Sequence, residues 1–220
     1  MFIVDKAPAS INQALPVPKV IFFDIDDTLS RNGIIATHNQ ATLEALAKTD
    51  IKLVISTGRS KAILPADILA LLEADVLDAI ICMNGQYSFD NKGLISHYPL
   101  SAEQADKIVQ LCQTSQLIHK FDSATHIAWS DENERLRDFN AKTPNSIVDP
   151  LYYQSNPVYQ CSVFFNNQFD KMQDIDFAQD DLKLVHWHHI GADILPANAS
   201  KARGIKDVCR YYGVDATECM

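Results

Sequence analysis

Three short apolar segments, separated by helix-like segments, restrict the folds open to the first part of this 220-residue chain. The segments KVIFFD (19–24), IKLVIST (51–57) and LDAIICM (77–83) are continuously apolar, which is typical of strands buried on both faces. Between them, THNQATLEALAK (37–48) and SKAILPADILALLEA (60–74) carry apolar residues at helical spacing. This β-α-β-α-β series predicts an α/β fold built on a doubly wound parallel sheet.

Local signals indicate where the helices begin and end. Thr37 and Gln40 have the spacing of a capping box, so we expect Thr37 to cap the first helix. Pro65 predicts a break in the second helix. Near the C-terminus, NASKARGIKDVCRYYG (198–213) predicts a helix that ends at Gly213, with Ala202 on its inward face.

After Asn84 the pattern changes, and a second unit is expected. QYSF (86–89) and LISHY (94–98) predict a hairpin, and a helix should open at Ser101, where a capping box reaches Gln104. Further strands are expected over 125–130, 159–165 and 182–190, and a further helix over 131–142. Hairpins in place of strict alternation indicate an α+β layer inserted into the first domain. We therefore expect the chain to divide into a flexible extension (1–18), a core (19–84), a cap domain (85–190) and the rest of the core (191–220), which the chain re-enters near ADILP (192–196).

Composition narrows the possible partners. The chain has 28 acidic residues against 19 lysines and arginines, for a net charge of −9, and no basic block, which argues against nucleic acid or an anionic membrane as the main partner. It has no run of about 18 apolar residues, and its opening lacks the basic end and apolar stretch of a signal peptide. We expect a cytoplasmic protein that binds small molecules, and we expect the five widely spaced cysteines to be buried free thiols.

Polar residues follow the first two predicted strands at the point where each strand ends. DIDDT (24–28) follows the first strand, and STGR (56–59) closes the second. Ligands in open parallel sheets bind at these carboxyl ends. Asp24 and Asp26 could converge there on one Mg²⁺, one carboxylate attacking a phosphorus atom and the other handling a proton. The simpler interpretations, a capped polar loop for DIDDT and an ordinary turn for STGR, stay open at this point.

The segments DIDDTL, STGR and SKARGI resemble, in order and context, the first three motifs of the haloacid dehalogenase superfamily. Within it the chain is similar to the Cof-like phosphatases, which insert an α/β cap between the second and third motifs. The resemblance covers nearly everything after Lys19 and implies a Rossmann-like core with a cap. It also implies a Mg²⁺-dependent phosphatase that forms an aspartyl-phosphate on a small phosphorylated metabolite, such as a sugar phosphate or a phosphorylated cofactor.

By position, the resemblance implies roles for four catalytic residues. Asp24 would be the nucleophile and Asp26 the general acid and base, and both would hold Mg²⁺, Asp24 through its carboxylate and Asp26 through its backbone carbonyl. Thr57 would donate a hydrogen bond to a phosphoryl oxygen. Lys201, at a helix start, would neutralise charge between nucleophile and phosphate.

A second set of residues is expected to contact substrate: Thr28, Gly58, Arg59 and Asn84. Helix capping and a hinge turn are equally open for the last two. Asp27 stands where the family usually has glycine, and we assign it no role. His186 and His188 of HWHH share a strand face and could bind a metal, although a place on the cap surface is the simpler interpretation.

Cof-like enzymes continue past the lysine helix into a strand that ends in a G-D-x-x-N-D motif, whose acids complete the Mg²⁺ site. This sequence stops at VDATECM (214–220), where that strand would begin. We therefore expect a core truncated at its C-terminus, with an open edge beside the first strand and impaired catalysis. The alternatives are a non-catalytic truncated or degenerate domain that binds a phosphorylated ligand, and a phosphomutase or phosphotransferase that uses the same aspartyl-phosphate.

Overall fold

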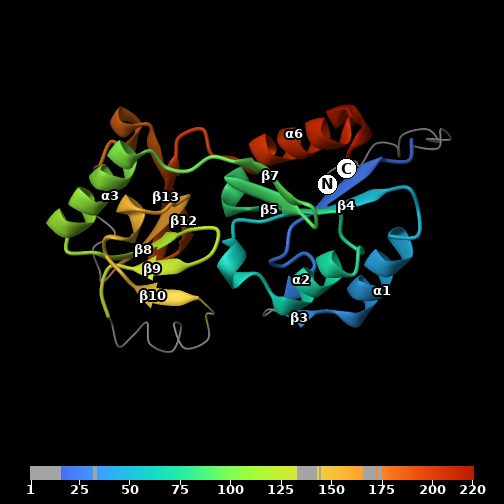
Figure 1. Ribbon diagram of the computed structural model, residues 1–220, viewed down its shortest axis with the longest axis horizontal. Coiled ribbons are helices and arrows are strands. Elements are labelled where there is room, and N and C mark those ends of the chain that lie inside the picture. The colour runs from blue at the N-terminus through green and yellow to red at the C-terminus, as the bar shows by residue number, and fades with distance from the viewer. Residues whose placement is uncertain (1–15, 32–33, 133–142, 144, 166–171, 173–174) are drawn as a thin grey trace, which may run out of the picture.

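The computed structural model describes residues 16–31, 34–132, 143, 145–165, 172 and 175–220. Two units lie side by side, each built on its own sheet (Figure 1). In the part of the chain described, the first sheet has the order β1-β4-β5-β6-β7, with the bounds β1 Val20–Phe23, β4 Lys52–Ser56, β5 Ala79–Cys82, β6 Tyr87–Asp90 and β7 Gly93–His97. We call this sheet and the helices packed on it the core unit.

Helices cover both faces of the core sheet. Helices α1 (Thr37–Leu46) and α2 (Ala66–Glu73) lie on one face and α6 (Lys201–Tyr212) on the other (Figure 1). Strands β1, β4 and β5 are parallel, so alternate residues serve the two layers. Leu53 packs in the cluster that contains residues of α1 and α2, whereas Val54 packs with Val208 of α6. The predicted doubly wound parallel sheet is confirmed.

The predicted helix boundaries are partly right. Helix α1 is capped by Ala36, whose side chain makes no capping bond, so the capping box at Thr37 was wrong. Thr37 already has helical geometry, and the Gln40 side chain donates instead to Glu44, one turn on, at 3.0 Å. The break at Pro65 is confirmed, because the short helix η1 (Lys61–Ile63) precedes it and α2 follows it.

The hairpin β6–β7 extends the core sheet, so its predicted place in the cap was wrong. Strand β6 pairs antiparallel with β5, with Phe89 opposite Ile80, and Phe89 is buried in the same cluster as Ile80. The pairing is possible because η2 (Met83–Gly85) turns the chain back beside the strand that it has just left. The second unit therefore starts after the hairpin and not at residue 85.

The second unit, which we call the cap unit, is a sheet with helix α3 (Ala102–Thr114) on one face (Figure 1). Its described strands have the order β10-β9-β8-β11-β13-β12, with the bounds β8 Ile118–Asp122, β9 Ile127–Trp129, β10 Ser146–Val148, β11 Gln160–Phe164, β12 Leu182–His188 and β13 Gly191–Pro196. The capping box at Ser101 and the strands expected near 125–130, 159–165 and 182–190 are confirmed.

Two expectations for this region fare differently. The segment ADILP was expected to return the chain to the core, but it forms most of β13, which pairs with both β11 and β12. That expectation was wrong, and the chain re-enters the core unit only after Pro196. The helix expected over 131–142 falls almost wholly on residues 133–142, outside the described part.

The remaining described elements are short. Strands β2 (Ser30–Arg31) and β3 (Ile34–Ile35) pair with each other, and single turns occur at η3 (Tyr152–Gln154), η4 (Phe177–Asp180) and η5 (Ala216–Glu218). No helix in the described part is both long and apolar enough to cross a bilayer.

Two features of the C-terminal region depart from the sequence analysis. Helix α6 ends at Gly213, which has a left-handed φ of +67° as expected, but Ala202 is exposed and Asp207 is buried in its stead. The edge of β1 is not open along its whole length. The N–H of Phe22 donates to the carbonyl of Met220 at 2.8 Å, and the N–H of Met220 donates to that of Val20 at 2.9 Å. The last residues of the chain thus run parallel to β1 and cover this part of its edge.

Candidate active site

Asp24 stands at the carboxyl end of β1 and faces Lys201 from the first turn of α6. The Lys201 Nζ lies 2.6 Å from Asp24 Oδ2, and Asp24 Oδ1 accepts the N–H of Ile25 at 2.8 Å. Each carboxylate oxygen therefore has a donor that fixes its direction. Both side chains are about two-fifths exposed, at 42% for Asp24 and 36% for Lys201, so a ligand can reach them.

Two glycines bring α6 close enough to place Lys201 there. A Cβ on Gly85 would lie 2.1 Å from the carbonyl oxygen of Ser200, the N-cap of α6. A Cβ on Gly204 would lie 2.5 Å from Ile81 of β5. Since no side chain fits at either position, glycine is required for the helix to start against the end of β5. The sequence analysis did not recognise these glycines, and no local pattern identifies a contact between segments so far apart.

Asp26 forms a two-pronged ion pair with Arg59. The Arg59 Nε donates to Asp26 Oδ2 at 2.9 Å, and Nη2 donates to Oδ1 at 2.7 Å. This hydrogen bonding lowers the pKa of Asp26 from its usual value, against the opposing effect of partial burial, and the charges of Arg59 and Lys201 add to the lowering. The same bonds raise the pKa of Arg59. Arg59, expected at a substrate contact or a helix cap, therefore has Asp26 as its partner in this state.

Thr57, Gly58 and Asn84 lie together beside the ion pair. Thr57 is buried, and its Oγ1 accepts the N–H of Arg59 at 3.1 Å. The carbonyl of Thr57 accepts the N–H of Asn84 at 3.2 Å, and a Cβ on Gly58 would lie 3.3 Å from the Asn84 amide oxygen. Asn84 itself has a left-handed φ of +53°, in the turn that leads from β5 into the hairpin. The ends of β4 and β5 thus form one compact loop cluster.

The loop after Asp24 is held by its own backbone. The N–H groups of Thr28, Leu29 and Ser30 all donate to the carbonyl of Ile25, at 2.8 to 3.3 Å. The side chains of Asp27 and Thr28 are exposed, and Asp27 has a left-handed φ of +56°. The position of Asp27 agrees with its having no assigned role, while the expected substrate contact of Thr28 stays a prediction.

The site fits Mg²⁺ in the kind of its donors. The Asp24 carboxylate and the oxygens of Asp26 are hard ligands, and Lys201 and Arg59 hold the two carboxylates in fixed directions. Among the described residues there is no cluster of three or more His, Cys, Asp or Glu side chains that could hold a metal. The remaining ligands of a Mg²⁺ ion would then be water and substrate oxygens, which this ion accepts readily.

His186, from the HWHH segment, lies on β12 of the cap unit, and the centroid of its ring is 6.3 Å from that of Phe165.

A buried charged network on the cap sheet was missed by the sequence analysis. Lys120 Nζ contacts both carboxylate oxygens of Asp122, at 2.7 and 2.8 Å, and the Gln160 amide donates to Asp122 at 2.8 Å. The two charged side chains are 6% and 0% exposed. The available signal was the alternation of polar residues in IHKFD and QCSVF, which places Lys120, Asp122, Gln160 and Ser162 on one face.

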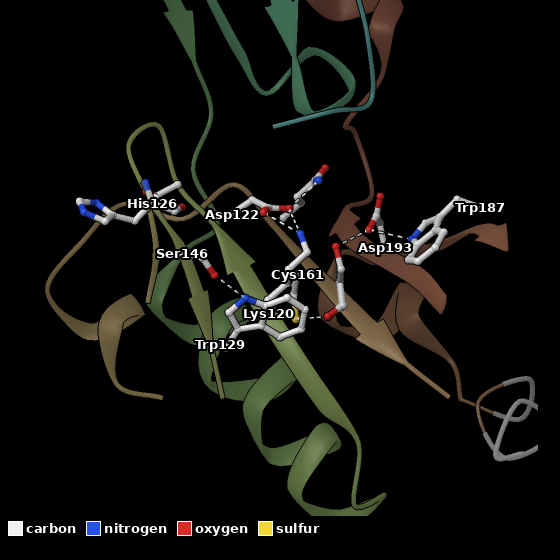
Figure 2. Close-up of polar contacts among 11 residues, drawn as sticks. Lys120, Asp122, His126, Trp129, Ser146, Cys161, Trp187 and Asp193 are labelled. Atoms are coloured by element: carbon white, nitrogen blue, oxygen red, sulfur yellow. Dashed lines mark hydrogen bonds and ion pairs between the residues drawn. The ribbon is translucent and has the colours of Figure 1, made fainter. Parts of the chain in front are cut away.

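Asp193 continues this face on the next strand. Its Oδ1 accepts the Ser162 hydroxyl at 2.7 Å and the Trp187 indole N–H at 3.1 Å. Burial raises the pKa of Asp193 to about 6, although the charge of Lys120 and the two hydrogen bonds oppose the shift. Figure 2 shows these side chains on the side of the sheet away from α3, toward the core unit. We call Lys120, Asp122, Gln160, Ser162 and Asp193 the polar face of the cap.

The chain belongs to the haloacid dehalogenase-like hydrolases, whose sequence model matches residues 21–220. A Bacillus subtilis protein named as a phosphatase, YkrA, is 26% identical over 194 residues, which are 86% of this chain and 73% of that protein. A Streptococcus pyogenes protein named as a bifunctional phosphatase and peptidyl-prolyl cis-trans isomerase is 26% identical over 200 residues. The match covers 89% of this chain and 42% of that protein.

Solved structures agree on the fold. The subclass IIB sugar phosphatase BT4131 of the same superfamily superposes with a TM-score of 0.76 at 24% identity, over 92% of this chain and 79% of that one. The chain is thus a hydrolase by family, and the curated relatives that it matches are named as phosphatases.

Proposed function

We propose that this protein is a Mg²⁺-dependent phosphatase of small phosphorylated metabolites that works through an aspartyl-phosphate on Asp24. The observation that carries the proposal is the contact of 2.6 Å between Asp24 and Lys201, which joins a strand end and a helix start 177 residues apart. A carboxylate held by a cation at the open end of a parallel sheet is placed to attack an anionic phosphoryl group. Relatives named as phosphatases support the same chemistry.

In the first half of the proposed reaction, Asp24 attacks the phosphorus atom. A new bond forms from its carboxylate oxygen, while the bond to the leaving alcohol breaks and Asp26 supplies the alcohol with a proton. Lys201 neutralises the charge that collects between nucleophile and phosphate, and the Thr57 hydroxyl donates a hydrogen bond to a phosphoryl oxygen. When bound, Mg²⁺ supplies further charge neutralisation for the transferred group.

In the second half, Asp26 takes a proton from the attacking water and phosphate leaves Asp24.

The ion pair with Arg59 keeps Asp26 ionised in the free protein. We infer that the incoming phosphate competes with Asp26 for the Arg59 guanidinium, because a guanidinium pairs with either a carboxylate or a phosphate through two parallel hydrogen bonds. Release from Arg59 would raise the pKa of Asp26, so that Asp26 could take up a proton from solvent and pass it to the leaving alcohol.

The margin of the polar face of the cap, at Asp193, is proposed to contact the leaving group, because Lys120, Asp122 and Gln160 are buried whereas Asp193 is partly exposed. A carboxylate at this place suits a hydroxylated molecule, because it can accept a hydrogen bond from a hydroxyl group. A sugar phosphate fits this description, and the structural relative BT4131 is named as a sugar phosphatase. Asp193→Ala is expected to raise KM for sugar phosphates while leaving KM for p-nitrophenyl phosphate little changed.

The 220-residue chain is expected to turn over slowly. Among the described residues, Asp24 and Asp26 are the acids at the site, and no cluster of three or more possible metal ligands is present. Two acids would bind Mg²⁺ weakly, which would leave the transferred oxygens poorly neutralised. The rate of p-nitrophenyl phosphate hydrolysis with Mg²⁺ measures this impairment.

The test is hydrolysis of p-nitrophenyl phosphate by the purified chain, with Mg²⁺ and with EDTA. Asp24→Asn should abolish the reaction, and Asp27→Asn, which alters an exposed acid of the same loop, should not. Acid quenching during turnover should leave a phosphoryl group on the peptide that contains Asp24. A reaction that survives in Asp24→Asn would refute the nucleophile, whereas binding of substrate without any turnover would favour the non-catalytic alternative.

A further inference from the structure

Two thiols meet where the last turn of α6 faces the C-terminal segment. The Sγ atoms of Cys209 and Cys219 are 3.5 Å apart. Cys209 is 4% exposed, whereas Cys219 is only partly buried. The other three cysteines, which also fall in the described part of the chain, are buried: Cys82, Cys112 and Cys161. Among the five, Cys219 is therefore the thiol that a dissolved oxidant reaches most easily.

The backbone holds the two thiols in register. The N–H of Lys19 donates to the carbonyl of Glu218 at 2.8 Å, and the N–H of Met220 donates to that of Val20 at 2.9 Å, which fixes the segment on either side of Cys219. The turn at Gly213 returns the chain along the helix, and the N–H of Val214 donates to the carbonyl of Cys209 at 2.9 Å. A disulfide needs an S–S distance of about 2.0 Å. Folding thus brings the thiols most of the way together.

We propose that Cys209 and Cys219 form a reversible disulfide when the protein meets a peroxide. The Cys219 thiolate attacks the peroxide O–O bond, which leaves a sulfenic acid on Cys219 and releases hydroxide or water. Cys209 then loses its proton and attacks the Cys219 sulfur, and the sulfenic oxygen leaves as water. Overall, two thiols lose two electrons to hydrogen peroxide, and two molecules of water form.

The surroundings of Cys209 support this order of events. Burial, together with the contact to Cys219, raises the pKa of the Cys209 thiol to about 11. Cys209 therefore stays protonated and enclosed in the reduced protein, and it reacts only once its neighbour has been oxidised. The assignment of Cys219 as the first thiol to react rests on its exposure and on the S–S distance.

The cross-link would join α6, which carries Lys201, to the C-terminal segment that pairs with β1. Cys209 lies on α6, whose first residue is Lys201, and Cys219 lies in the segment paired with β1, the strand that ends at Asp24. A closed loop of this length restricts the unfolded chain, so the oxidised protein should melt at a temperature higher by about 5 °C.

The experiment treats the reduced 220-residue chain with one equivalent of hydrogen peroxide, blocks the remaining thiols and digests with trypsin. Trypsin cuts after Lys206 and Arg210, which places the two cysteines on separate peptides, 207–210 and 211–220. We expect these two peptides to be recovered linked by a disulfide, and separated again after dithiothreitol. The melting temperature of the same oxidised sample should rise.

Two variants make the test specific. Cys219→Ala should abolish both the linked peptides and the rise in melting temperature, whereas Cys112→Ala, at a buried thiol of the cap unit, should retain both. Recovery of the 211–220 peptide as an unlinked sulfinic acid, or with its thiol still free after peroxide treatment, would overturn the proposal. So would links that form mainly between separate molecules.

Discussion

The buried ion pair of the cap sheet offers a sharp test of how this fold tolerates charge. In the variant Lys120→Met, Asp122 loses both of its bonds to Lys120 and keeps the amide of Gln160. Hydrogen bonds to charged groups contribute about 1.5–3 kcal/mol each, and breaking a buried ion pair from one side costs about 3–5 kcal/mol. Because Asp122 is 0% exposed, water cannot replace the lost donor. We expect the free energy of unfolding to fall by about 3–5 kcal/mol.

The matched control is Lys107→Met in the same unit. Lys107 lies 3.7 Å from Asp180, and the two side chains are 48% and 42% exposed. An exposed pair of this kind contributes below about 1 kcal/mol, because water screens it. Urea titration followed by circular dichroism measures both variants against the parent protein.

The double variant Lys120→Met, Asp122→Leu tests the cause. It removes the unpaired charge along with its partner, so much of the lost stability should return. If Lys120→Met costs no more than Lys107→Met, or if the double variant is as unstable as the single one, the buried pair is not what the single substitution disturbs.

Three further predictions concern single sites. Arg59→Gln should raise the pKa of Asp26 in a ¹³C NMR titration. In the folded parent this pKa is lowered, so the pair stabilises the protein above the unfolded pKa and that stability is lost as the pH falls through the folded pKa. The variant lacks the pair, so its stability should not show this loss on acidification. Asp193 has a raised pKa of about 6, so the stability that it contributes at low pH is lost as the pH rises through 6. In Asp193→Asn the urea midpoint of unfolding should therefore change less with pH over that range. Gly85→Ala should destabilise the fold more than Gly213→Ala, although both glycines have a positive φ. A Cβ at Gly85 would lie 2.1 Å from a backbone oxygen, whereas one at Gly213 would meet open space. Equal melting temperatures of the two variants would contradict this.

Much of the core could be predicted from the sequence because its signals are local. Continuous apolar segments such as β4 predict buried parallel strands wherever they occur, and the turn at Gly213 follows from one residue. The order of three motifs was enough to expect Asp24 and Lys201 in one site, and the structure places them 2.6 Å apart.

The choice of partners was decided only by the tertiary structure. The hairpin β6–β7 has the pattern of any exposed hairpin, and its position beside β5 depends on a turn that local propensity does not specify. The same holds for β13, which was expected to lead out of the cap and lies between two of its strands. Which strands pair depends on the packing of the whole sheet, so neither segment alone specifies its partner.

The contacts of charged side chains follow the same rule. From the sequence, Arg59 was expected at a substrate contact or a helix cap, and no role was assigned to the lysine and aspartate of IHKFD. In the folded chain Arg59 holds Asp26, and Lys120 and Asp122 are enclosed together. Which charged groups meet, and how deeply each pair is buried, are properties of the whole packing arrangement and not of any one segment.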